Sequence, residues 1–114
     1  VVPGATRVAW DESRPVLSYK TVWEASIRSI RELQPMAEDL QVNIALENVW
    51  NRFVLSPMEW HFYLSEFHSD RVGMYFDLGN CCLFARPQDY IEILGKKIKA
   101  IHVKLCRRTP WFWR

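Results

Sequence analysis

The stretch that decides the fold is Asn43 to Asn51, which reads NIALENVWN. Residues 42–46 are apolar apart from Asn43, and the run ends in a carboxylate, Glu47, that leads into a polar and aromatic loop. A short apolar run between helix-like segments is typical of a buried strand in a parallel sheet covered by helices. Because such folds place their chemistry at the carboxyl ends of the strands, Glu47 is the first candidate for a functional residue.

The composition sets the size and class of the protein. With 114 residues, of which 49% are hydrophobic and 25% charged, the chain is long enough for one small globular domain. Its formal net charge of +2 is too small to indicate nucleic acid or a membrane surface as a partner. No apolar run approaches the roughly 20 residues of a membrane span, and no signal peptide is expected. The three cysteines lack C-x-x-C spacing, so we expect thiols in a reducing cytoplasm rather than a zinc site.

Helix and strand signals alternate along the chain. The expected strands are a strand end over residues 1–4 and full strands over 43–47, 72–77 and 98–104. Between them we expect three helices. The first begins at a capping box over residues 21–24 and is kinked or divided by Pro35, the second runs from the Ser56-Pro57 start signal to about Phe67, and the third begins at Pro87. This alternation predicts an α/β fold with parallel strands joined by right-handed crossovers.

Side chains two apart on a strand share a face, and each predicted strand has one face of the same kind. That face carries a small residue and, at the strand end, a residue able to bind a metal ion. The small residues are Ala45, Gly73 and Ala100, and the potential ligands are Glu47, Asp77 and His102. The same alternation assigns Ile98 to this face. Small residues suit the crowded interior of a closed barrel, whose carboxyl end the polar residues would then surround.

Two carboxylates and one imidazole form an oxygen-rich set of ligands. Such a set favours Mn²⁺, Mg²⁺ or Co²⁺ over a structural zinc ion. Taken singly, each residue has another interpretation: Glu47 as a solvated or capping residue, Asp77 as part of a turn, and His102 as a packed core histidine. The shared face of all three residues is the reason to prefer a metal site.

Three segments resemble the xylose isomerase-like TIM barrels, specifically the sugar phosphate isomerase/epimerase group: NIALENVWN at 43–51, YFDLGN at 75–80 and IHVK at 101–104. The resemblance extends over nearly the whole chain to Lys104. A complete (β/α)8 TIM barrel needs about 250 residues, so the resemblance implies that residues 1–114 are a single partial barrel domain with about three complete strand-helix units. Residues 105–114 fit the family poorly, and our hypothesis is an atypical terminus that arises from a shifted reading frame or an artificial end.

The resemblance also implies an activity. Members are divalent-metal-dependent sugar or sugar-phosphate isomerases and epimerases that transfer a proton through a metal-bound enediolate. Glu47 matches both a ligand and the catalytic acid/base, Asp77 and His102 match further ligands, and the fourth ligand is expected on a later strand outside the chain. Candidate substrate-binding residues are Asn80, Lys104 and Arg108, with Arg107 as the alternative to Arg108.

Other functions remain open at this point. Leu105 replaces an Asp common in relatives, which favours a non-catalytic fragment or remnant; an inosose dehydratase-like or hydroxypyruvate isomerase-like enzyme also fits the residues. An AP endonuclease-type nuclease is disfavoured, because Asn80 stands where a further histidine is needed and the net charge is small. We also expect weak or absent activity of the isolated chain and self-association through exposed sheet edges.

Overall fold

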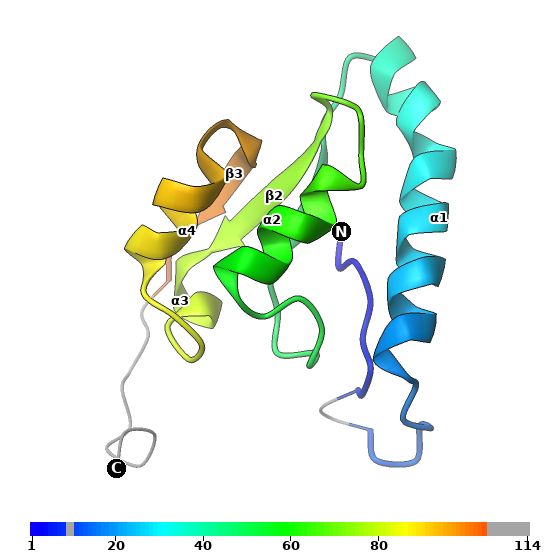
Figure 1. Ribbon diagram of the computed structural model, residues 1–114, viewed down its shortest axis with the longest axis vertical. Coiled ribbons are helices and arrows are strands. Elements are labelled where there is room, and N and C mark those ends of the chain that lie inside the picture. Colours follow the sequence, from blue (N-terminus) through cyan, green and yellow to red (C-terminus); the bar gives the residue numbers. More distant parts are fainter. Residues whose placement is uncertain (9–10, 105–114) are drawn as a thin grey trace.

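The computed structural model describes residues 1–8 and 11–104 (Figure 1). Arg107, Arg108 and Leu105, singled out from the sequence, lie outside the described residues. The elements are α1 (Tyr19–Asp39), β1 (Ile44–Glu47), α2 (Pro57–Ser65), β2 (Val72–Asp77), the short α3 (Leu78–Cys81), α4 (Pro87–Leu94), the 3-10 helix η1 (Gly95–Lys97) and β3 (Ile98–His102). The strands therefore lie within a residue or two of their predicted bounds, whereas α3 was not predicted.

The three strands form one parallel sheet in the order β1-β2-β3. At the outer edge of β1, the Val1 amino group donates to the Ala45 carbonyl at 2.9 Å, and the Glu47 N–H donates to the Val1 carbonyl at 2.8 Å. These two bonds follow the pattern of a parallel ladder. They confirm that the start of the chain lies against β1 as a strand end would, between α1 and the sheet (Figure 1).

The first helix differs from its prediction in two respects, its N-terminal cap and its continuity through Pro35. Ser18, not the box over residues 21–24, caps α1, because its side chain accepts the N–H of Thr21. Pro35 does not divide the helix, which continues to Asp39. Pro35 and Arg31 are both exposed, so the carbonyl that loses its helical partner at this point can be solvated.

The second helix begins as predicted. Ser56 accepts the Glu59 N–H at 3.2 Å, and the Glu59 carboxylate accepts the N–H groups of Ser56 and Leu55 at 2.8 and 3.0 Å. Tyr19 adds a bond that no local pattern indicates, since its hydroxyl donates to the other Glu59 oxygen at 2.8 Å. The start of α1 is thereby fastened to the start of α2.

This cluster predicts a pH dependence of stability. Burial raises the pKa of Glu59, but the N–H groups and the Tyr19 hydroxyl outweigh it and hold that pKa below its ordinary 4.5. A carboxylate with a lowered folded pKa stabilises the fold above about pH 4.5, and this contribution is lost as the pH falls through the folded value. We expect Glu59→Gln to lower the melting temperature at pH 7, and we expect its difference from the wild type to shrink as the pH falls below 4.5. Glu32→Gln, at an exposed position of α1, is the control, and an equal effect of the two variants would contradict the assignment.

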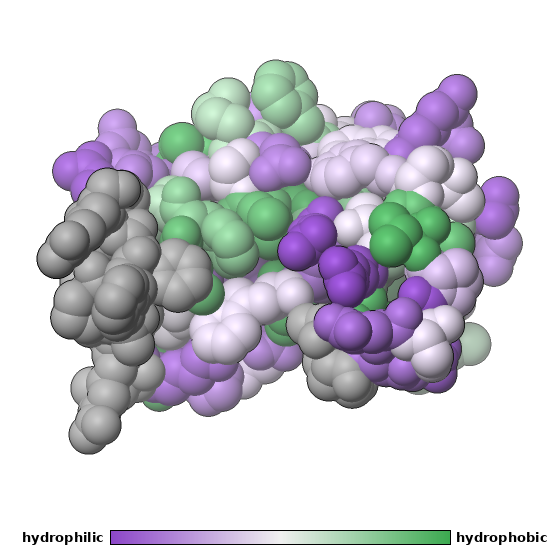
Figure 2. All heavy atoms as spheres, turned by 90° about the horizontal axis from the view of Figure 1, so that it is seen from below, coloured by the Kyte–Doolittle hydropathy of each residue, from purple (hydrophilic) through white to green (hydrophobic). Residues whose placement is uncertain are grey.

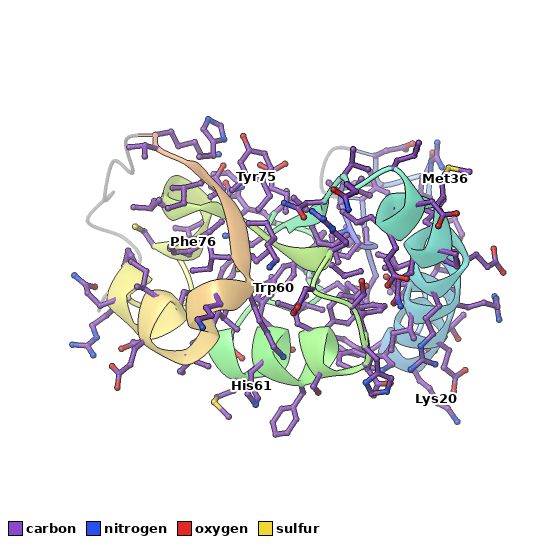
Figure 3. The ribbon with its side chains drawn as sticks, turned by 90° about the horizontal axis from the view of Figure 1, so that it is seen from above. Lys20, Met36, Trp60, His61, Tyr75 and Phe76 are labelled. Carbon is purple, nitrogen blue, oxygen red and sulfur yellow. The ribbon has the colours of Figure 1, made fainter. Side chains whose placement is uncertain are left out.

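The core lies between the sheet and the helices on one of its faces (Figure 3). Trp60 of α2 points toward the sheet and is fully buried, whereas His61 next to it points away. Phe76 lies on the helix side and stacks on Tyr90 of α4 with ring centroids 5.1 Å apart. Tyr75 points to the face that the helices leave uncovered. The alternation of faces predicted for β2 is thus confirmed.

The prediction for β3 is wrong at Ile98. An irregularity in the β2–β3 register falls between Met74, which pairs with Ile98, and Tyr75, which pairs with Ala100. Ile98 consequently packs against the core under the helices and does not share the face of Ala100 and His102. A register shift of this kind breaks strict alternation, and nothing in the local sequence announces it. The later pairs, ending with Asp77 opposite His102, keep the predicted relation between the candidate ligands.

The predicted crowding beside Gly73 is confirmed. A Cβ at this position would lie 2.5 Å from the Cγ of Lys99 and closer still to the Lys97 backbone carbonyl. We expect Gly73→Ala to destabilise the fold by about 1–3 kcal/mol, because backbone cannot move aside as a side chain can. The measurement is urea unfolding of Gly73→Ala beside the wild type, and an unchanged unfolding free energy would contradict this account.

β3 forms one edge of the described sheet. Ile101 is 56% exposed and Val103 is 77% exposed, so apolar side chains are uncovered beside this edge. The predicted self-association through sheet edges agrees with that exposure and stays a prediction, which size-exclusion chromatography of the chain would test. No helix among residues 1–8 and 11–104 is both long and apolar enough to cross a bilayer.

Candidate metal and substrate site

The structure brings the three predicted ligands together at the carboxyl ends of the strands. Glu47 ends β1, Asp77 ends β2 and His102 ends β3, and one potential ligand atom from each lies within 4.8 Å of the others. The His102 Nδ1 atom is 3.0 Å from Asp77 Oδ2 and 3.9 Å from Glu47 Oε1. These separations suit three ligands that surround one cation, because metal-oxygen and metal-nitrogen distances are a little over 2 Å.

The two oxygens of Asp77 have separate roles. Oδ1 accepts the Asn80 N–H at 2.8 Å and so caps α3, which confirms the turn interpretation. Oδ2 is buried and, within the described part of the chain, accepts no hydrogen bond, although the Lys104 ammonium lies 2.9 Å away. A buried carboxylate oxygen without a donor is costly unless positive charge lies beside it. Its position fits a metal ligand, and the turn and ligand interpretations are therefore compatible.

The charge state of Asp77 agrees with this geometry. Burial raises the pKa of its carboxyl, but the Lys104 ammonium, the Asn80 N–H and the His102 ring outweigh burial and hold the pKa below its ordinary 3.8. Asp77 is therefore ionised at neutral pH. A carboxylate must be deprotonated to bind a metal ion, so no proton has to leave this ligand first.

Asn48 fixes the position of Asp77 relative to Glu47, and the sequence argument did not identify it. Its side-chain Oδ1 accepts the Asp77 N–H at 2.7 Å, and its Nδ2 donates to the Asp77 carbonyl at 2.9 Å. The amide thus continues the β1–β2 pairing by one step with side-chain atoms. Because Asn48 directly follows Glu47, these bonds set the separation of the two ligand carboxylates. Its place next to Glu47 in a polar loop was the only signal available.

The predicted substrate residues Asn80 and Lys104 lie beside the ligands. Asn80 is buried, donates its amide to the Asn48 carbonyl at 2.8 Å, and accepts the Lys104 ammonium at Oδ1, also at 2.8 Å. Its polar atoms are thereby occupied within the chain. Lys104 is 39% exposed and passes over Gly79, where a Cβ would collide with its aliphatic stem. The absence of a side chain at Gly79 lets the ammonium approach Asp77.

A cleft of about 370 Å³ opens next to these residues. Apolar groups from the start of the chain and from the loop after β1 form most of its lining, and Asn80 and Lys104 close the end near the ligands. Trp50 is 54% exposed, and its Nε1 donates to the Asn80 carbonyl at 3.3 Å. Figure 2, which views the side where α3 and this loop lie, shows apolar groups gathered across the middle of the face with strongly hydrophilic groups beside them.

The loop after β1 is held in a defined shape. Asn51 accepts the Phe53 N–H on its side chain and the Thr6 N–H on its backbone carbonyl, and its amide donates to the Gly4 carbonyl. Arg52 and Val54 have φ values of 56° and 51°, a conformation that a β-branched residue adopts only at a cost. The bonds of Asn51 and the full burial of Val54 offset that strain. The loop therefore presents Trp50 in a fixed place.

The family comparison covers almost the whole chain. The sequence model of the family described as xylose isomerase-like TIM barrel matches residues 1–110. A search of the curated proteins found no match.

Three solved structures share the backbone arrangement. A D-psicose 3-epimerase, solved in the presence of D-fructose, has a TM-score of 0.73 and 18% identity over 89% of this chain and 38% of that one. A D-tagatose 3-epimerase-like protein has a TM-score of 0.70 and 26% identity over 90% of this chain and 39% of that one. A xylose isomerase domain protein from Planctomyces limnophilus has a TM-score of 0.61 and 15% identity over 86% of this chain and 33% of that one. The chain thus spans between a third and two fifths of these proteins, and the predicted fold class, part of a TIM barrel with parallel strands, is confirmed.

Proposed function

Because this chain belongs to the xylose isomerase-like TIM barrel family, we propose that it forms part of a divalent-metal-dependent sugar or sugar-phosphate isomerase or epimerase. The observation that supports the proposal is the convergence of Glu47, Asp77 and His102, whose potential ligand atoms lie within 4.8 Å of one another. The position of the buried Asp77 Oδ2, 3.0 Å from His102 Nδ1 and 2.9 Å from the Lys104 ammonium, also supports it. The proposal keeps the cytoplasmic setting expected from the cysteine pattern.

Mn²⁺, Mg²⁺ or Co²⁺ held by Glu47, Asp77 and His102 would polarise a substrate carbonyl and so acidify the neighbouring C–H group. Glu47 is the residue suited to take that proton. Its side chain is 24% exposed, whereas Asp77 is fully buried, so of the two carboxylates only that of Glu47 is accessible. A carboxylate has two oxygens, and Glu47 can use one as a ligand and the other as the base.

The proposal assigns substrate binding to three residues by resemblance. Lys104 and Asn80 adjoin Asp77, and the exposed side of the Lys104 ammonium is available to a substrate hydroxyl or phosphate. Asn80 would also position Lys104, whose ammonium its Oδ1 accepts. Arg108 completes the set as a proposal from sequence alone.

The test is exchange of a carbon-bound proton with solvent. In D₂O with Mn²⁺, the completed barrel that contains this chain should promote deuterium incorporation next to the carbonyl of a ketose such as D-fructose, measured by NMR. Glu47→Gln should slow this exchange by about 100-fold or more, because it removes the base that moves the proton. Glu24→Gln, at an exposed position of α1, is the charge-matched control. Exchange that survives Glu47→Gln unchanged, or that never rises above the metal ion alone, would contradict the proposal.

A further inference from the structure

An exposed tryptophan at the carboxyl end of the sheet is surrounded by cationic side chains. Lys104 Nζ lies 6.0 Å from the centroid of the Trp50 ring. A polar extension of the cleft, of about 290 Å³, is lined by Arg7, Glu12, Trp50 and Arg52. Arg7 and Trp50 line both this extension and the apolar cleft, so the two spaces adjoin at these side chains.

The positive charge in this extension is only partly compensated. Arg7 forms an ion pair with Glu12 at 3.5 Å, but the Glu12 side chain is 87% exposed, and such pairs contribute little. Within the described residues, Arg52 has no ion-pair partner. A divalent ion at the strand ends would balance Glu47 and Asp77. The three cations around Trp50 would then face a single carboxylate, and the mouth of the site would carry excess positive charge.

The order of the groups across the cleft defines what fits it. Lys104, which contacts the candidate ligand Asp77, lines the apolar cleft. Trp50 and Arg7 line both spaces, and Arg52 lines only the extension. An aromatic face beside apolar groups suits the C–H face of a sugar. Paired guanidinium groups suit a phosphate, whose oxygens accept two parallel N–H bonds from each arginine.

We propose that Arg7 and Arg52 form a phosphate subsite and that the substrate is a sugar phosphate, with its sugar ring on Trp50 and its phosphate at the end remote from the reacting carbon. This inference rests on the proposed function and adds to it the class of substrate. A hydrogen bond between the two segments supports this proposal. The Thr6 hydroxyl donates to the Arg52 carbonyl at 3.1 Å, which keeps the segment that carries Arg7 beside the loop that carries Arg52.

The test uses isothermal titration of the full chain in EDTA, at fixed low salt, with inorganic phosphate, D-fructose 6-phosphate, D-fructose and D-glucuronate. We expect D-fructose 6-phosphate to bind at least about tenfold more tightly than D-fructose, since hydrogen bonds between charged groups are the strong ones. Arg7→Gln and Arg52→Gln should each lower the affinity for phosphate and for D-fructose 6-phosphate about tenfold and leave the affinity for D-fructose unchanged. Glutamine at position 52 meets the same positive φ as arginine, so the loop should keep its shape.

Arg28→Gln, at an exposed position of α1, removes the same charge away from the cleft and should change none of these affinities. Equal binding of D-fructose and D-fructose 6-phosphate, unchanged phosphate affinity in both arginine variants, or tighter binding of D-glucuronate than of the phosphate would each overturn the inference. A separate Mn²⁺ titration keeps the two proposals apart. Loss of Mn²⁺ binding with phosphate binding intact counts against the metal site alone, and the reverse result counts against the phosphate subsite alone.

Discussion

Replacing Asp77 by asparagine should weaken Mn²⁺ binding by about 100-fold or more, since removal of even an outer-shell partner costs 10–100-fold. The exchange is nearly isosteric, and an asparagine Oδ1 can still accept the Asn80 N–H and cap α3. What disappears is the charge on the buried Oδ2, which lies 3.0 Å from His102 and 2.9 Å from Lys104. Isothermal titration with Mn²⁺ measures the change, and circular dichroism checks that the fold is kept.

Asp39→Asn is the matched control for this experiment. Asp39 is the last residue of α1, is exposed, and lies at the end of that helix farthest from the carboxyl ends of the strands (Figure 1). Its substitution removes one negative charge without touching the candidate ligands. If the two variants lost Mn²⁺ affinity equally, the ion would be responding to net charge, and the three strand ends would not be its site.

The second large effect is expected at Asn48. Asn48→Leu leaves the Asp77 N–H and carbonyl without their partners in a buried place, which should cost roughly 3 kcal/mol of stability, at about 1–3 kcal/mol for each unsatisfied group. Because these bonds also set the separation of Glu47 and Asp77, Mn²⁺ affinity should fall about 10–100-fold. Urea unfolding and Mn²⁺ titration of the same sample give both quantities.

Two further variants separate positioning from a general loss of stability. Asn48→Asp keeps an oxygen to accept the Asp77 N–H and should be intermediate in both measurements. Asn43→Leu, at an exposed position just before β1, repeats the change of side chain without the two bonds and should behave as the wild type. A variant at Asn48 with normal stability and normal Mn²⁺ affinity would contradict the role assigned to this residue.

The convergence of the three candidate ligands could be predicted because it depends on strand ends and on alternation along β1 and β2. Glu47, Asp77 and His102 lie where parity places them, even though the irregular register beside Gly73 moves Ile98 to the helix side. That irregularity could not be predicted, because it arises from pairing between strands rather than from either strand alone.

The supporting residues escaped prediction for a related reason. Asn48 and Tyr19 act through bonds to groups distant in the sequence, whose positions only the folded chain defines. The capping box at Ser56 is the opposite case, because all its bonds lie within four residues and local sequence is enough.

The contact between Gly79 and Lys104 means that residue 79, which is not a candidate ligand, can change the cation affinity of the candidate site. Any side chain at 79 would push the lysine stem outward and withdraw its ammonium from the aspartate, altering the local field while every ligand stays in place. Evolution could therefore tune how strongly a cation is held by varying one glycine, leaving the chemistry of the strand ends intact.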